Sequence, residues 1–211
     1  NGYTVTISKG IWISLIISVI LTYLLSVTFT TPLEVLFYLN AAGVILQAFA
    51  YTFILKGILK GLRSINFHNS IIRSLFFLGI GSLVAKVFIQ LVVVVPFIAV
   101  ISYTIHNYVI AFIHLIMLGS ITFTVSALLM QQGLIPTSKI AKTGWIILAS
   151  GFLLTGFILF GQGTLLWMEA GFIPKYYEIL FGASILLPFG IALIIVPFIP
   201  ERFAVTYQKS L

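Results

Sequence analysis

Three polar residues recur at helical spacing in a stretch that is otherwise apolar. Ser82, Lys86 and Gln90 are four residues apart, within the apolar stretch 71–101, so on a helix they share one face. An ammonium group near the centre of a bilayer costs about 2.5 to 3.5 kcal/mol even on the lenient insertion scale. Lys86 is therefore a counter-ion for an anionic ligand or a proton-pathway residue, or else a structural lysine that snorkels or bonds to freed carbonyl groups.

His114 is the second side chain that could do chemistry at membrane depth. It lies nine residues after Ile105, where we expect its helix to enter the membrane, and therefore about 13 Å deep at 1.5 Å per residue. A neutral imidazole there either hydrogen-bonds across a helix interface or ligates a metal or haem. His106, eight residues earlier, is offset by about 80° on the helix. We keep His106 as a second candidate ligand, although an interfacial histidine is more often solvated.

The remaining polar residues predict two levels across the helices. Counting from the expected ends of the spans places Asn40 and Gln90 at a depth similar to that of His114. Gln47 and Lys86 form a deeper level near the midplane. Both levels must face protein, because polar side chains within a membrane almost always face the bundle interior or a water-filled cavity.

The composition restricts the elements that can position these residues to membrane-spanning helices. Of the 211 residues, 61% are hydrophobic and 7% are charged, against about 25% charged residues in soluble domains. The apolar stretches are too long for the alternating segments of a β-barrel. Cys and Asp are absent, which excludes disulfides, thiol catalysis, cysteine-ligated metals and a Ser-His-Asp set.

Six spans are predicted, and the whole chain is expected to form one all-α transmembrane domain. Because it begins at Asn1 without an initiator Met, we expect it to be a segment of a longer polypeptide. The spans cover about 11–28, 33–59, 71–101, 105–130, 138–161 and 174–199.

The charge distribution predicts an orientation with both termini in the cytoplasm. Nine of the 11 basic residues fall on one side of the six-span arrangement, and the positive-inside rule makes that side cytoplasmic. The net charge of +7 is then explained by topology and by contact with anionic lipid, so no nucleic-acid partner is needed. The nine residues are Lys9, Lys56, Lys60, Arg63, Arg73, Lys139, Lys142, Arg202 and Lys209.

The segment Ala111-Phe112-Ile113-His114-Leu115-Ile116-Met117-Leu118-Gly119 resembles a helix of the haem-copper oxidase and nitric oxide reductase catalytic subunits. That helix carries a His-x-His pair, and His114 corresponds to its second histidine, the low-spin haem ligand. The layout, with Ala85-Lys86-Val87-Phe88-Ile89-Gln90 before this helix, also resembles bacterial membrane proteins related to that superfamily and to the NnrS group. In the twelve-span fold these six spans would be the seventh to twelfth.

The resemblance implies a multi-pass protein of the bacterial inner membrane that holds a b-type haem through His114 and transfers electrons or senses a diatomic gas. Its partners would be the missing half of the polypeptide and other membrane subunits. The first histidine of the pair is replaced by Phe112, which argues against a complete binuclear oxygen-reducing centre. Two other functions stay open: a haem-free structural subunit of a membrane complex, and a transporter or proton-conducting subunit that uses Lys86, Gln47 and Gln90.

Overall fold

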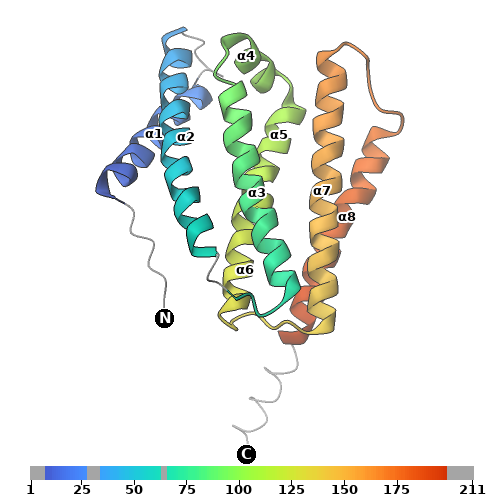
Figure 1. The fold of residues 1–211 in the computed structure, drawn as a ribbon. Coiled ribbons are helices and arrows are strands. Elements are labelled where there is room, and N and C mark those ends of the chain that lie inside the picture. The colour runs from blue at the N-terminus through green and yellow to red at the C-terminus, as the bar shows by residue number, and fades with distance from the viewer. Residues whose placement is uncertain (1–7, 28–33, 63–65, 199–211) are drawn as a thin grey trace, which may run out of the picture. The chain divides into compact units, whose positions relative to one another are not determined.

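The computed structural model describes residues 8–27, 34–62 and 66–198, and in these ranges the regular structure is entirely helical (Figure 1). This confirms the all-α class. Five helical segments are long and apolar enough to cross a membrane, whereas the described apolar part of the first helix, Lys9–Tyr23, is shorter. The six spans and the cytoplasmic termini stay predictions. The five segments are Val35–Gly61, Ser70–Val92, His106–Gln131, Lys139–Trp167 and Tyr176–Phe198.

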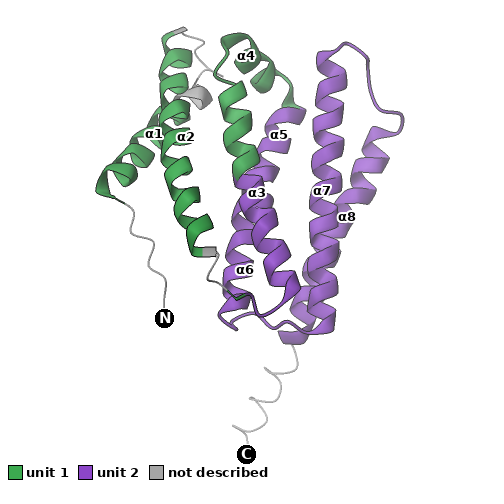
Figure 2. Ribbon diagram, viewed as in Figure 1, with its two compact units in different colours: residues 1–66, 84–106 green, residues 67–83, 107–211 purple. Residues whose placement is uncertain are grey.

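The chain divides into two compact units (Figure 2). Unit 1 comprises residues 1–66 and 84–106, and unit 2 comprises residues 67–83 and 107–211. Helix α3 (Ser70–Val92) contributes its first part to unit 2 and its second part to unit 1. The polar residues singled out above are therefore divided between the units.

In unit 1, helix α1 (Lys9–Val27) packs against helix α2 (Glu34–Leu62). The contact is close at Gly43, where an added Cβ atom would lie 2.6 Å from the Cβ atom of Leu21. Small residues let helix backbones approach in this way, which matters in a bilayer because lipid tails are as apolar as the side chains.

The predicted third span, 71–101, is not continuous. Helix α3 ends at Val92, residues 93–95 form a turn, and a separate helix, α4 (Pro96–Thr104), begins at Pro96. Proline has no N–H to continue the ladder and disfavours helical backbone at the residue before it. Val95 is accordingly extended, with φ −70° and ψ 119°. The sequence-based boundary was wrong because Pro96 starts a new helix instead of bending the old one.

Unit 2 contains a segment that changes its helical pitch halfway. Helix α5 (His106–His114) passes into a π-helix, η1 (Leu115–Thr122), and then into helix α6 (Phe123–Gln131). A π-helix of eight residues is long, since most π-helical structure occurs as single-turn bulges. His114 is the last α-helical residue before the change.

The other two long helices of unit 2 are α7 (Lys139–Trp167) and α8 (Tyr176–Ile195), which is followed by a 3-10 turn, η2 (Val196–Phe198). The backbones of α7 and α8 approach closely at glycine residues, because an added Cβ atom at Gly144 would lie only 2.7 Å from the carbonyl oxygen of Gly190. Gly151 packs against Leu186 in the same way. At Gly156 and Gly182, by contrast, an added Cβ atom would meet nothing within 4 Å.

Helix α7 extends beyond the predicted fifth span, 138–161, to Trp167. It begins at a Ser138 cap, whose hydroxyl accepts a hydrogen bond from the Ala141 N–H, and such caps satisfy one orphan donor of the first turn. Near its other end the fully buried Gln162 holds the following loop, because its amide donates to the Gly171 carbonyl and accepts from the Ile173 N–H. The loop between α7 and α8 is therefore shorter than the predicted spans 138–161 and 174–199 imply.

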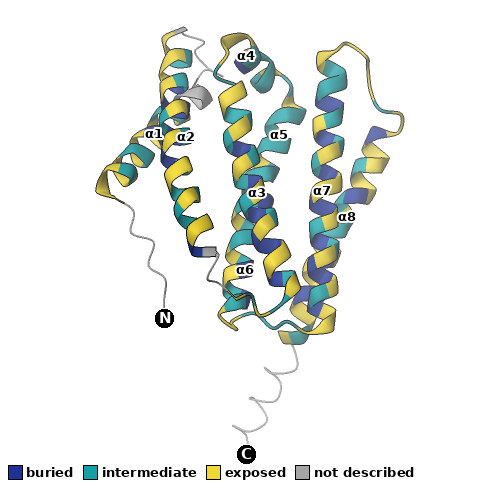
Figure 3. Cartoon of the chain, viewed as in Figure 1, coloured by how far each residue is buried: buried dark blue, intermediate teal, exposed yellow. Residues whose placement is uncertain are grey.

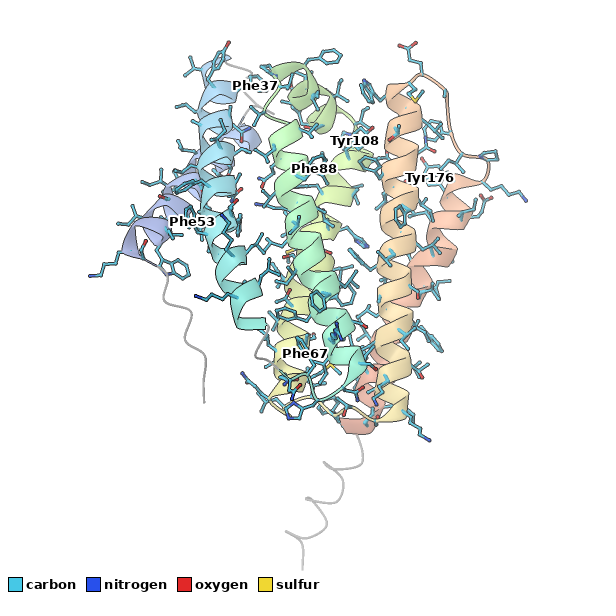
Figure 4. All side chains as sticks on the ribbon, in the orientation of Figure 1. Phe37, Phe53, Phe67, Phe88, Tyr108 and Tyr176 are labelled. Atoms are coloured by element: carbon cyan, nitrogen blue, oxygen red, sulfur yellow. The ribbon has the colours of Figure 1, made fainter. Side chains whose placement is uncertain are left out.

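Side-chain hydrogen bonds join α5 to α7 and α8 at this loop end of unit 2. Tyr108 donates to the Thr164 hydroxyl at 3.1 Å, and the Asn107 amide donates to the Tyr176 hydroxyl at 2.8 Å. Figure 4 labels Tyr108 and Tyr176 among the side chains of these helices. Partly buried polar pairs of this kind join helices whose outer faces are apolar.

The opposite end of unit 2 is basic. Arg73 lies in the first turn of α3, and Lys139 and Lys142 lie in the first turn of α7. Residues of both first turns line one cavity, so the two helices begin side by side. The positive-inside prediction requires that Arg73, Lys139 and Lys142 lie at the same end of the helices, and they do. Arg63, Arg202 and Lys209 lie outside the described residues.

Figure 3 shows exposed positions along the helices of both units, and many of them are large apolar residues. Phe157 and Phe181 are examples in unit 2, and Phe88 and Phe97 in unit 1. A soluble protein seldom exposes so many large apolar side chains. These side chains are compatible with contact to the lipid bilayer, as the composition predicts.

Candidate functional site

The central polar contact of unit 1 joins Lys86 of α3 to Gln47 of α2. The Lys86 Nζ donates a hydrogen bond to the Gln47 Oε1 at 2.9 Å. Lys86 is only 8% exposed and Gln47 only 4%. The sequence predicted both residues for one deep level, and the structure makes them direct partners.

An aromatic ring is the second neighbour of the Lys86 ammonium group. The Nζ atom lies 5.2 Å from the centroid of the Tyr51 ring, within the range of a cation–π interaction. Tyr51 follows Gln47 by four residues on α2, so the two side chains share a helix face. The sequence analysis did not select Tyr51 as part of this site. Its spacing of four residues from Gln47 is the sequence signal that predicts a shared helix face.

Two further amides belong to unit 1. Asn40 is buried on α2, seven residues before Gln47 and thus on nearly the same helix face. Gln90 follows Lys86 by one turn on α3; its Oε1 atom is buried and has no hydrogen-bond partner among the described residues. Gln90 is therefore a buried acceptor one turn from Lys86 that no described residue uses.

No carboxylate takes part in the interactions described for Lys86, which consist of one neutral amide and one ring. A hydrogen bond to a neutral amide stabilises an ammonium group but does not cancel its charge, and a buried charge without a counter-charge is costly. The site can thus lower its free energy by losing a proton from Lys86 or by gaining an anion.

Ser82, the third residue of the predicted polar face, lies in unit 2 and is buried. Its hydroxyl donates to the Leu78 carbonyl oxygen of its own helix at 2.8 Å. It also lies against Gly119 of η1, where an added Cβ atom would come within 2.6 Å of the Ser82 Oγ. The structure therefore assigns Ser82 to close helix packing.

His114 occupies the interface between α5 and α7 in unit 2. Its Nε2 atom lies 2.8 Å from the Thr155 Oγ1, and the Thr155 hydroxyl lies 2.7 Å from the Gly151 carbonyl oxygen. A hydroxyl has one hydrogen. When Thr155 donates it to Gly151, a neutral His114 ring donates to Thr155 from Nε2–H and Nδ1 is unprotonated. In the other tautomer the Thr155 hydroxyl donates to Nε2.

Aromatic packing holds the same imidazole. The ring of Phe152 lies 5.7 Å from the His114 ring, with an angle of 20° between the planes. Phe152 also meets Phe123 of α6 edge to face at 5.3 Å. The sequence analysis selected neither Thr155 nor Phe152 as a partner of His114, because contacts between distant helices leave no local pattern in the sequence.

His106 is exposed at the start of α5, whereas His114 is partly buried at its end. The structure does not bring the two together, and the predicted offset of their side chains around the helix gives the reason. Gln90, predicted at the depth of His114, belongs to the other unit, and their common level stays a prediction.

Haem binding at His114 requires a ring nitrogen directed at iron and space for a macrocycle beside it. The Nε2 atom is instead occupied by Thr155, and Phe152 covers the ring. The described side chains therefore do not fit a haem bound through the His114 Nε2 atom. The His114 Nδ1 atom has no hydrogen bond to a described residue.

The described residues also contain no group of three or more His, Cys, Asp or Glu side chains that could hold a metal ion. Comparison with known proteins adds no family: no family model, curated protein or solved structure matches the chain.

Proposed function

We propose that this chain is a proton-conducting subunit of a membrane protein and that Lys86 is its intramembrane proton-binding group. The observation that carries the proposal is the 2.9 Å hydrogen bond from a buried lysine ammonium to a neutral amide. An ionisable residue within a membrane span marks a functional site by default, because its burial is costly.

The surroundings of Lys86 favour a proton over a larger anionic solute. Lys86 is only 8% exposed, and its Nζ atom lies against the Gln47 Oε1 atom and the Tyr51 ring, so these contacts occupy the space that a larger solute would need beside the ammonium group. A proton needs no such space. Gln47 can accept from the charged lysine and, after amide rotation, donate to the neutral amine, so the pair holds both protonation states.

The test is proton flux in phosphatidylcholine vesicles that contain the purified protein, an internal pH-sensitive dye, and potassium with valinomycin to compensate charge. Lys86→Gln removes the titratable group but keeps a hydrogen-bonding side chain. We expect the flux to fall at least tenfold, to the level of protein-free vesicles.

The matched control is Lys56→Gln, which removes an exposed lysine of α2 that lies over the Phe53 ring. Its flux should equal that of the unmodified protein. Equal flux from the Lys86→Gln variant, or none from the unmodified protein, would overturn the proposal.

A second candidate is the haem protein implied by the resemblance to haem-copper oxidases and NnrS-like proteins. The observation that favours it is the π-helix that begins directly after His114, since π-helical segments occur frequently at functional sites. It requires the contact between His114 and Thr155 to open.

The test of this candidate is the absorption spectrum of the protein purified from haem-supplemented cells. A Soret band that disappears in His114→Ala but persists in His106→Ala would support it. A protein without a Soret band, or a band retained in His114→Ala, would reject His114 as a haem ligand.

A further inference from the structure

A cavity of about 430 Å³ lies in unit 2 between the first turns of α3 and α7. Polar groups line its outer end, where Asn69 and Ser70 begin α3 and Lys142 lies in the first turn of α7. Farther along the helices its walls are mostly apolar, with Leu78 on α3 and Leu153 on α7, and include the hydroxyl residues Ser74 and Ser150. The two leucines are about 12 Å and 16 Å beyond Ser70 and Lys142 at 1.5 Å per residue.

The outer end of this cavity has the chemistry of an anion site. The Arg73 N–H is bonded to the Asn69 carbonyl, so the amides of the three residues between them have no partner within the helix. Two of those residues, Ser70 and Ile71, line the cavity. Helix N-termini favour negative charge, Lys142 adds a full positive charge, and none of the lining residues is acidic.

A buried donor without a partner is the second, independent observation. Trp145 lines the cavity, is only 4% exposed, and its indole Nε1–H has no hydrogen-bond partner among the described residues. A buried N–H without an acceptor is costly. Trp145 follows Lys142 by three residues, one turn deeper on the same face of α7. A ligand bound in the cavity would supply the missing acceptor for the Trp145 Nε1–H.

The apolar side of the cavity distinguishes a lipid from a free anion. Ile146 lines it and is 57% exposed, and Leu153 lines it and is 42% exposed, so the cavity continues into the apolar outer face of α7. A free phosphate would gain nothing from these walls. An acyl chain would extend along them, while basic residues at this end attract an anionic headgroup.

We propose that the groove between α3 and α7 binds one anionic phospholipid. Its phosphate lies against Lys142 and the N-terminal amides of α3, an ester oxygen one turn deeper accepts the hydrogen bond of Trp145, and an acyl chain follows Leu78, Ile146 and Leu153. This site is independent of Lys86.

The first experiment is native mass spectrometry of the delipidated protein in detergent, titrated separately with phosphatidylglycerol and phosphatidylcholine. We expect one phosphatidylglycerol to bind more tightly than phosphatidylcholine. Lys142→Gln should reduce that preference about fivefold, the effect of one cation near an anionic lipid surface. The matched control, Lys139→Gln, removes an exposed lysine of the same turn that does not line the cavity, and should change the preference by less than twofold.

The second experiment locates the lipid at Trp145. In the double variant Trp12→Phe/Trp167→Phe, Trp145 is the remaining tryptophan of the three in the chain. Brominated phosphatidylglycerol, as a minor component of phosphatidylcholine vesicles, should quench its fluorescence more than brominated phosphatidylcholine at the same fraction. Trp145→Phe, which keeps a ring but loses the N–H, should weaken phosphatidylglycerol binding several-fold.

Three results would overturn the proposal: no preference for phosphatidylglycerol, equal losses in the Lys142→Gln and Lys139→Gln variants, or displacement of the lipid by millimolar inorganic phosphate. The last would make the site a free-anion site.

Discussion

Lys86 in unit 1 and His114 in unit 2 both place an ionisable side chain between helices of membrane-spanning length, and each has one hydrogen-bonded partner. The two partners, Thr155 and Gln47, differ in whether they leave a charge uncompensated. Thr155 already bonds the Gly151 carbonyl of its own helix, so the histidine completes a neutral chain of donors and acceptors. Gln47 gives Lys86 an acceptor but no negative charge.

This difference separates a satisfied polar contact from one that retains unbalanced charge. A neutral imidazole bonded to a hydroxyl resembles many interhelical contacts, which contribute about 0.6 kcal/mol on average in membrane proteins. An ammonium group with a neutral partner has a reason to exchange its proton or to recruit an anion. For this reason we place the proposed function at Lys86.

The strongest test of the comparison is to remove the partner of the charge. Gln47→Leu leaves the Lys86 ammonium buried without an acceptor, and we expect a loss of about 3 kcal/mol in the free energy of unfolding. Equilibrium unfolding in mixed micelles measures it. The double variant Lys86→Met/Gln47→Leu should regain stability to within about 1 kcal/mol of the unmodified protein, since both polar groups are then gone. A double variant as unstable as Gln47→Leu would show that packing, not charge, is responsible.

A second test concerns the packing that holds the His114 environment. An added Cβ atom at Gly119 would lie 2.6 Å from the Ser82 Oγ and 2.7 Å from the Phe152 Cζ. We therefore expect Gly119→Ala to destabilise the protein by about 1 to 3 kcal/mol through overpacking, measured by the same unfolding assay. Gly156→Ala, where the space is open, should be neutral or stabilising by up to about 1 kcal/mol. Similar losses at both glycines would contradict the packing argument.

The third test removes the partner of the neutral residue. Thr155→Val keeps the shape of the side chain but leaves the His114 Nε2 atom without its hydrogen-bond partner. The expected loss is about 0.6 kcal/mol and no more than about 1.7 kcal/mol, well below that for Gln47→Leu. Thr155→Ser should restore the contact. A loss in Thr155→Val as large as that in Gln47→Leu would remove the distinction between the two sites.

The smallest expected effect is at Gln90. Its Oε1 atom is buried without a partner among the described residues, so Gln90→Leu removes an unsatisfied acceptor. We expect a change near zero, or a gain of about 1 kcal/mol, in unfolding measurements. A clear loss would indicate that Gln90 completes the Lys86 site through a contact formed during proton transfer, and flux measurements on the same variant would show it.

The helical class and the positions of the chemically capable residues could be predicted from the sequence. The long apolar stretches indicated helices, and the four-residue spacing placed Ser82, Lys86 and Gln90 on one face. Both follow from local periodicity, which is a property of one helix. The continuous span 71–101 was predicted wrongly because the apolar pattern runs through Pro96, whereas the backbone does not.

The partners were decided by the tertiary structure. Gln47 is 39 residues from Lys86, and Thr155 is 41 residues from His114. In a soluble protein the polar side of each helix would mark the side that faces water and so limit the pairings. Here the lipid-facing and protein-facing sides are both apolar, so the sequence determined which residues need a partner, and the rotation and packing of the helices determined which residue each one has.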